Sequence, residues 1–91
     1  KSEKGTQVDL LIDRADHVIN LCEVKFYNTK FTIDKKYAQE ILTKVNAFTE
    51  DTKTTKSIFV TFITTYGLVF NQYSRQLVQN ELTMDHLFID L

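Results

Sequence analysis

The segments "TQVDLLIDR" (residues 6–14) and "NLCEVKF" (residues 20–26) decide the fold, because both have the apolar patterns of sheet strands. Turn-prone residues separate them, so the pair predicts a β-hairpin. Strand interiors rarely carry charge, yet Asp9 lies within the first segment, and Glu23 and Lys25 lie within the second. These three side chains are therefore the first candidates for chemistry.

The length of the hairpin connection decides whether the three charges meet. A connection over residues 15–17 places Asp9 opposite Glu23, with Lys25 on the diagonal, and matches apolar with apolar residues on both faces. A two-residue connection instead places Asp9 on the face away from Glu23. We expect the first register, because it gathers the charges into one cluster.

The rest of the chain predicts one helix packed on a sheet, followed by shorter elements. Thr32 is expected to be the N-cap of a helix that runs to about residue 49, with Asp34 in its first turn. Residues 57–66 are apolar on both faces and predict a central strand covered on both sides. The later expectations are a short strand or edge at 68–70, a loop at 71–76, a last strand at 77–82, and a helix at 84–89 capped by Thr83.

The apolar side chains predict where the core lies. The helical stripe comprises Ile33, Tyr37, Ile41, Val45 and Phe48. Four aromatic residues of the second half are also expected in the core: Phe59, Phe62, Tyr66 and Phe70. Cys22 lies on an apolar strand face and is expected to be a core residue rather than a nucleophile.

Length and composition favour one α/β (α+β) domain over residues 1–91 with a mixed sheet. The net charge of −1 argues against non-specific coating of nucleic acid, although it allows a local basic face. One cysteine excludes an internal disulfide, and no apolar run approaches the about 20 residues of a membrane helix. We therefore expect a cytoplasmic protein without a membrane partner, and a fragment of a longer chain because the first strand begins almost at once.

Two facing carboxylates repel each other unless a hard cation lies between them. Magnesium prefers oxygen ligands, so Asp9, Glu23 and the backbone carbonyl of Val24 form a candidate site for Mg²⁺ or Mn²⁺. Lys25 beside the ion would polarise an attacking water and pair with a phosphate oxygen, which predicts metal-assisted phosphodiester hydrolysis. The alternative is simpler, since Glu-Val-Lys on a strand is common as a solvated ion pair.

An Asp on the first strand of a hairpin, Glu-x-Lys on the second, then a helix and a hydrophobic strand resemble the PD-(D/E)XK nuclease superfamily. The segments "QVDLLIDR", "NLCEVKF", "FTIDKKYAQEILTK", "ITTYG" and "VQNELTMDHLF" resemble the C-terminal domain of a group of bacterial AAA-type ATPases. This resemblance covers nearly the whole chain. It implies a restriction-endonuclease-like sheet, and a C-terminal fragment that lacks the helix and strand with which the family core begins.

The resemblance also implies roles for particular residues. The metal-binding acids fall on Asp9 and Glu23, and the catalytic lysine falls on Lys25. Some family members use polar residues of the following helix, where Lys36, Tyr37 and Gln39 are candidates, although Tyr37 also fits the core. The expected DNA contacts are Lys35, Lys36, Gln39 and Lys44, with a solvated helix face as the alternative.

Three classes of function follow from the sequence. The first is a metal-dependent DNA nuclease attached to an upstream ATPase domain, which would bind ATP outside this chain because no phosphate-binding loop motif is present. The second is a catalytically degenerate nuclease fold that binds DNA or docks its ATPase. The third is an interaction domain that forms a homodimer through an open sheet edge.

Overall fold

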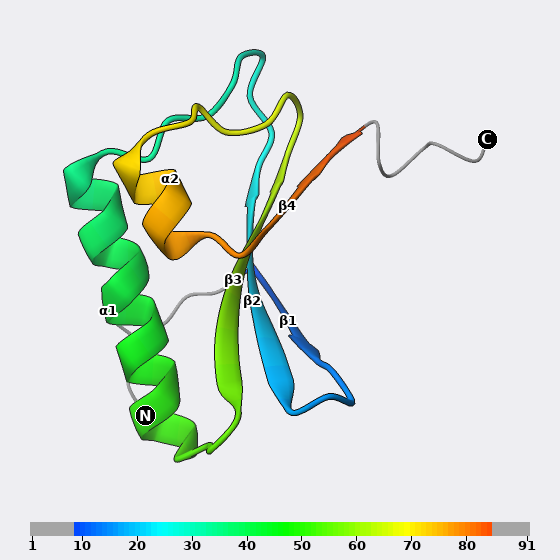
Figure 1. Cartoon of the computed structure of the whole chain (residues 1–91), viewed down its shortest axis with the longest axis vertical. Coiled ribbons are helices and arrows are strands. Elements are labelled where there is room, and N and C mark those ends of the chain that lie inside the picture. The colour runs from blue at the N-terminus through cyan, green and yellow to red at the C-terminus, as the bar shows by residue number, and fades with distance from the viewer. Residues whose placement is uncertain (1–8, 85–91) are drawn as a thin grey trace.

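The computed structural model describes residues 9–84, which form a four-stranded mixed sheet with both helices on one face (Figure 1). The order of strands is β1-β2-β3-β4, and β1 is antiparallel to β2, whereas β2/β3 and β3/β4 are parallel. This arrangement confirms the expected mixed α/β sheet. The elements are β1 (Leu10–Asp13), β2 (Val18–Lys25), α1 (Lys35–Thr52), β3 (Ser57–Thr64), α2 (Gln72–Leu77) and β4 (Asn80–Thr83).

The hairpin of β1 and β2 has the register of the three-residue connection. Leu11 lies opposite Leu21, and the Arg14 N–H donates to the Val18 carbonyl at 2.8 Å. His17 closes the turn with a left-handed backbone (φ 71°), as three-residue hairpin loops require. The register prediction is therefore confirmed.

Helix α1 begins at Lys35 with Asp34 as its N-cap, so the prediction of Thr32 as the N-cap is wrong. The Asp34 backbone is extended, and its carboxylate accepts a hydrogen bond from the Tyr37 N–H at 2.8 Å. Phe31 pairs with Leu68 in an isolated parallel bridge three residues before this cap. The helix also continues to Thr52, beyond the expected end.

Strand β3 lies centrally, as expected, but ends at Thr64 instead of residue 66. Gly67 follows with a φ of 100°, and its N–H donates to the Thr64 hydroxyl at 2.7 Å. This turn stops the alternation of the strand. Among the described residues, helices cover only one face of the sheet, in contrast to the cover on both sides that the apolar pattern predicted (Figure 1).

The loop predicted at residues 71–76 is wrong, because α2 occupies most of that segment. A capping box starts the helix: the Asn71 side chain accepts from the Ser74 N–H, and the Ser74 hydroxyl accepts from the Asn71 N–H. A six-residue helix has too few turns to display an apolar stripe in the sequence. The capping residues Asn71 and Ser74 were therefore the sequence feature that could have predicted this helix.

The C-terminal expectations are met in part. The short strand expected at 68–70 is the single bridge between Phe31 and Leu68, and the last strand begins at Asn80 instead of residue 77. Thr83, the expected N-cap of a further helix, is the last residue of β4. Residues 85–89 of that expected helix lie outside the described residues.

The core lies between α1 and β3. Its buried members are Ile33, Ala38, Ile41, Val60, Phe62 and Leu68, with Tyr37 and Val45 packed against them. The helical stripe is thus confirmed at Tyr37, Ile41 and Val45, whereas Ile33 is a core residue that precedes the helix. The prediction that Tyr66 and Phe70 belong to the core is wrong, because their side chains are 57% and 80% exposed beyond the end of β3.

Candidate functional site

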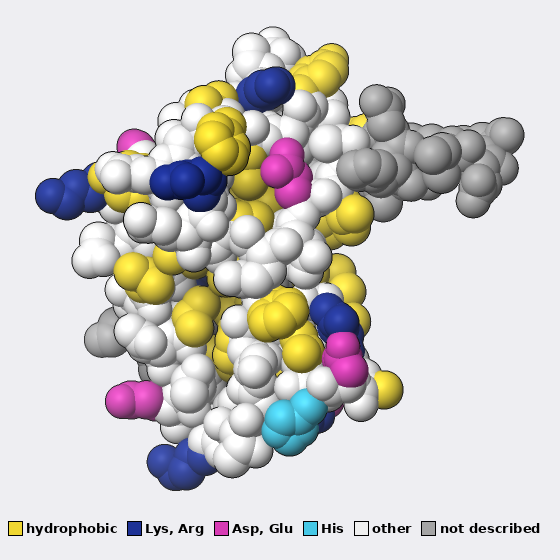
Figure 2. All heavy atoms as spheres, viewed as in Figure 1, with side chains coloured by type: hydrophobic (Ala, Val, Ile, Leu, Met, Phe, Trp, Pro, Cys, Tyr) yellow, Lys and Arg dark blue, Asp and Glu magenta, His cyan; other side chains and the backbone are white. Residues whose placement is uncertain are grey.

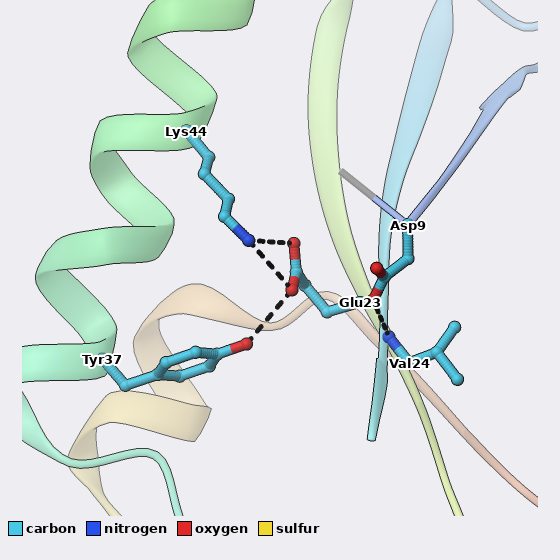
Figure 3. A network of polar contacts seen from close by, with 5 residues as sticks. All are labelled: Asp9, Glu23, Val24, Tyr37 and Lys44. Carbon is cyan, nitrogen blue, oxygen red and sulfur yellow. Dashed lines mark hydrogen bonds and ion pairs between the residues drawn. The ribbon is translucent and has the colours of Figure 1, made fainter. Parts of the chain in front are cut away.

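Asp9 and Glu23 lie near each other at one end of the hairpin. Strand β1 begins at Leu10, which pairs with Cys22, so Asp9 directly precedes the strand next to the position of Glu23. One Asp9 carboxylate oxygen accepts a hydrogen bond from the Val24 N–H at 2.8 Å (Figure 3). The Asp9 side chain thereby continues the hydrogen bonding of the sheet where β1 begins.

Glu23 is a buried carboxylate, only 2% exposed, and both of its oxygens have partners on α1. The Lys44 ammonium lies 3.3 Å from Oε1 and 3.1 Å from Oε2, and the Tyr37 hydroxyl donates to Oε1 at 3.1 Å (Figure 3). Tyr37 and Lys44 are seven residues apart, so they lie within about 20° of each other around the helix axis. Two turns of α1 therefore hold one strand carboxylate.

Burial and charge keep the Tyr37 phenol protonated. Burial, followed by the negative charge of Glu23 and the hydrogen bond to it, raises the pKa of Tyr37 well above its usual value. A neutral phenol donates a hydrogen bond, whereas a phenolate would repel Glu23. The network therefore requires the protonated form of Tyr37.

The raised pKa of Tyr37 predicts a loss of stability in alkali. The folded chain retains this proton more tightly than the unfolded chain, so the stabilisation is complete below the usual pKa and declines above it. We expect the advantage of the wild type over Tyr37→Phe to shrink by about 1 kcal/mol between about pH 8 and about pH 11. Urea unfolding of both proteins measures it, and an advantage that stays constant with pH would contradict it.

Lys25 lies two residues beyond Glu23, so both side chains point to the α1 face of the sheet. Its ammonium lies 5.2 Å from the centroid of the Tyr37 ring and 5.8 Å from that of Phe31. These are cation–π contacts, which hold a lysine without neutralising its charge. The Lys25 ammonium is thus held over two aromatic rings on the face of the sheet to which Glu23 also points.

Among the helix residues that the sequence singled out, the structure brings Tyr37 and Lys44 into the site. Lys35, Lys36 and Gln39 are exposed on α1. The sequence placed Lys44 off the apolar stripe as a DNA contact and missed its pairing with Glu23. The seven-residue spacing from Tyr37 was the available signal, because it puts Lys44 on the side of the helix that faces the sheet.

The carboxylate and carbonyl oxygens at this end of the hairpin are the ligand type that a hard divalent cation prefers. In an antiparallel pair, one residue directs its N–H and its C=O to the same neighbouring strand. Because the Val24 N–H donates to Asp9, the Val24 carbonyl also points to the β1 side. Within residues 9–84, no group of three or more His, Cys, Asp or Glu side chains gathers, so a cation here would depend on Asp9, Glu23 and this carbonyl.

Lys44 already neutralises Glu23 in the absence of any added cation. A divalent ion that binds both Glu23 oxygens must displace the ammonium that lies about equally close to each of them. The cluster of Asp9, Glu23, Lys25 and Lys44 combines two negative and two positive side chains. It can therefore exist as a self-neutralised network or, with Lys44 withdrawn, offer a carboxylate to a metal.

Cys22 is buried, as expected. Its burial and the nearby charge of Glu23 raise the pKa of the thiol, which disfavours a nucleophilic thiolate.

Neither helix within residues 9–84 has the length and apolar character needed to cross a membrane. Comparisons with family models, curated proteins and solved structures found no match to this chain. The case for a function therefore rests on the residues of the site.

Proposed function

We propose that the chain is a nuclease-like domain that hydrolyses phosphodiester bonds with Mg²⁺ or Mn²⁺, in the manner of the PD-(D/E)XK superfamily that its sequence resembles. One observation supports the proposal: the hairpin register pairs Leu10 with Cys22, and continued by one residue it would pair Asp9 with Glu23, two residues before Lys25. A hairpin followed by a crossover helix and a parallel strand is also the element order expected of a restriction-endonuclease-like core.

The residues of the site have separate roles in this proposal. Asp9, Glu23 and the Val24 carbonyl hold the cation, which when bound supplies a Lewis acid for the scissile phosphate and its attacking water. Lys25 keeps its positive charge on the faces of Phe31 and Tyr37, ready to bind a phosphate oxygen. Tyr37 orients the Glu23 carboxylate through its hydroxyl.

The partners follow from the same proposal. We infer DNA as the substrate, an AAA-type ATPase domain in the same protein as the partner that supplies ATP binding, and the cytoplasm as the location. The exposed lysines of α1, Lys35 and Lys36, lie on the helix that carries Tyr37 and Lys44, so they are available to phosphates that approach the site.

A second candidate, a catalytically degenerate nuclease fold used as a binding module, is favoured by the neutralisation of Glu23. Lys44 and Tyr37 satisfy this buried carboxylate without a metal. In that case the cluster serves to hold α1 on the sheet, and the domain would bind DNA or its ATPase without cleaving a strand.

Metal binding and cleavage distinguish the two candidates. We expect Asp9→Asn to weaken Mn²⁺ binding by about tenfold or more, because it removes one charged ligand while its amide oxygen still accepts from Val24. Calorimetric titration with Mn²⁺, beside cleavage of labelled DNA by the protein that carries this chain, measures both effects. Asp13→Asn is the matched control, since Asp13 is exposed and pairs with Lys56 outside the site. A folded wild type that neither binds Mn²⁺ nor cleaves DNA would favour the binding module.

A further inference from the structure

Four large aromatic side chains stand exposed where β2 and β3 end. They are Phe26 and Tyr27 after β2, which are 55% and 51% exposed, and Tyr66 and Phe70 after β3. We call these four residues the aromatic platform. All four lie in the two connections at the same end of the sheet, where exposed apolar side chains can form a binding surface.

The two segments that carry the platform are fastened to each other. The Phe31 N–H donates to the Gly67 carbonyl, and the Val69 N–H donates to the Phe31 carbonyl, both at 2.9 Å. This parallel bridge joins the connection after β2 to the connection after β3, which lie together at the top of Figure 1. The rings therefore project from a pair of loops whose backbones are hydrogen-bonded to each other.

Cations outnumber acids around the platform although the chain as a whole carries −1. The cations are Lys25, Lys30 and Arg75, and the acids are Asp34, which is the N-cap of α1, and Glu81, whose carboxylate accepts a hydrogen bond from the Leu68 N–H at 2.8 Å. The Arg75 guanidinium lies 5.7 Å from the centroid of the Phe70 ring. Figure 2 shows hydrophobic, basic and acidic side chains next to one another at this end of the molecule.

A series of ring contacts connects the platform to the buried carboxylate. The Tyr27 and Phe31 ring centroids are 5.3 Å apart, and those of Phe31 and Tyr37 are 5.4 Å apart. Tyr37 then donates to Glu23. A ligand on the exposed ring of Tyr27 would thus lie on the same aromatic series that seats Lys25 and orients Glu23.

We propose that the aromatic platform binds the unpaired bases of a single-stranded nucleic acid, with Lys25, Lys30 and Arg75 on its phosphates. The inference rests on the proposed function for the chemical nature of the ligand, and it adds the strandedness that the site alone does not specify. Exposed rings stack on any base, and adjacent cations follow the backbone, which is how proteins hold single strands without reading sequence. Paired bases would not offer their faces to these rings.

The test measures binding without a metal, so that it is independent of cleavage. A fluorescein-labelled oligodeoxythymidylate of about 15 nucleotides is titrated with the wild-type chain in EDTA, and fluorescence anisotropy reports binding. We expect Phe70→Ala to weaken binding by about tenfold and Phe70→Trp to preserve it, since base stacking on one ring accounts for such a factor. Leu42→Ala is the matched control, because Leu42 is an exposed apolar residue on α1.

Three results would overturn the inference. They are an absence of single-strand binding by the wild type, equal or tighter binding of a DNA duplex of the same length, and a Phe70→Ala variant that binds like Leu42→Ala. The first result would instead leave a protein contact as the role of the surface. Single-strand binding in EDTA without Mn²⁺ binding or cleavage would support the platform and refute the nuclease, so the two proposals fail separately.

Discussion

Replacing Lys44 with methionine is expected to lower the free energy of unfolding by about 3 kcal/mol, because it leaves the Glu23 carboxylate buried without its counterion. Glu23 is 2% exposed, and the Lys44 side chain is 20% exposed, so water cannot fully compensate for the lost ammonium. Methionine has a similar length and volume, which keeps the effect of lost packing small. Urea unfolding of the 91-residue chain, followed by circular dichroism, measures the difference.

Two further variants separate charge from packing. Lys36→Met removes an exposed lysine from the same helix and is expected to change stability little. The double variant Glu23→Gln/Lys44→Met removes both charges, while the glutamine oxygen still accepts from Tyr37, and is expected to recover much of the loss. If Lys44→Met were no more destabilising than Lys36→Met, the ion pair would not stabilise the fold.

Replacing Lys25 with methionine is expected to lower the rate of Mn²⁺-dependent cleavage by about 100-fold or more, because it removes the cation placed to bind the phosphate oxygen. The same change should leave the affinity for Mn²⁺ nearly intact, since Lys25 supplies no metal ligand. The cation–π contacts with Phe31 and Tyr37 contribute about 1 kcal/mol, so the variant should remain folded.

The division between rate and affinity makes this test of Lys25 specific. Single-turnover cleavage of labelled DNA by the protein that carries the chain gives the rate, and calorimetric titration with Mn²⁺ gives the affinity. Lys25→Arg retains the charge and the ring contacts but alters the donor geometry, so it should retain part of the rate. A Lys25→Met protein with the rate of the wild type would exclude a catalytic role for this lysine.

The hairpin and its register were predictable because a three-residue connection pairs Leu10 with Cys22 and Leu11 with Leu21, and this register also gathers the charged residues. The long helix was predictable from its stripe, and Ile33 and Ile41 lie in the core as expected. The N-cap was misplaced because Thr32 and Asp34 are both good caps. The choice between them depends on the bridge between Phe31 and Leu68, which is a contact distant in sequence.

The partner of Glu23 was not predictable from strand patterns. Lys44 is 21 residues away along the chain, and its approach depends on how α1 crosses the sheet. Tyr66 and Phe70 were misplaced for a related reason. They lie near a strand with apolar faces, but Gly67 turns the backbone, so the side chains there no longer alternate between the two faces of the sheet.

The site residues and the residues that support them come from different halves of the chain, because α1 packs against β3. Asp9, Glu23, Tyr37 and Lys44 all come from the first half of the chain. The helix that carries the last two rests on Val60 and Phe62 of the second half, neither of which belongs to the site. A substitution at Phe62 would therefore disturb the site although Phe62 contributes no functional group to it.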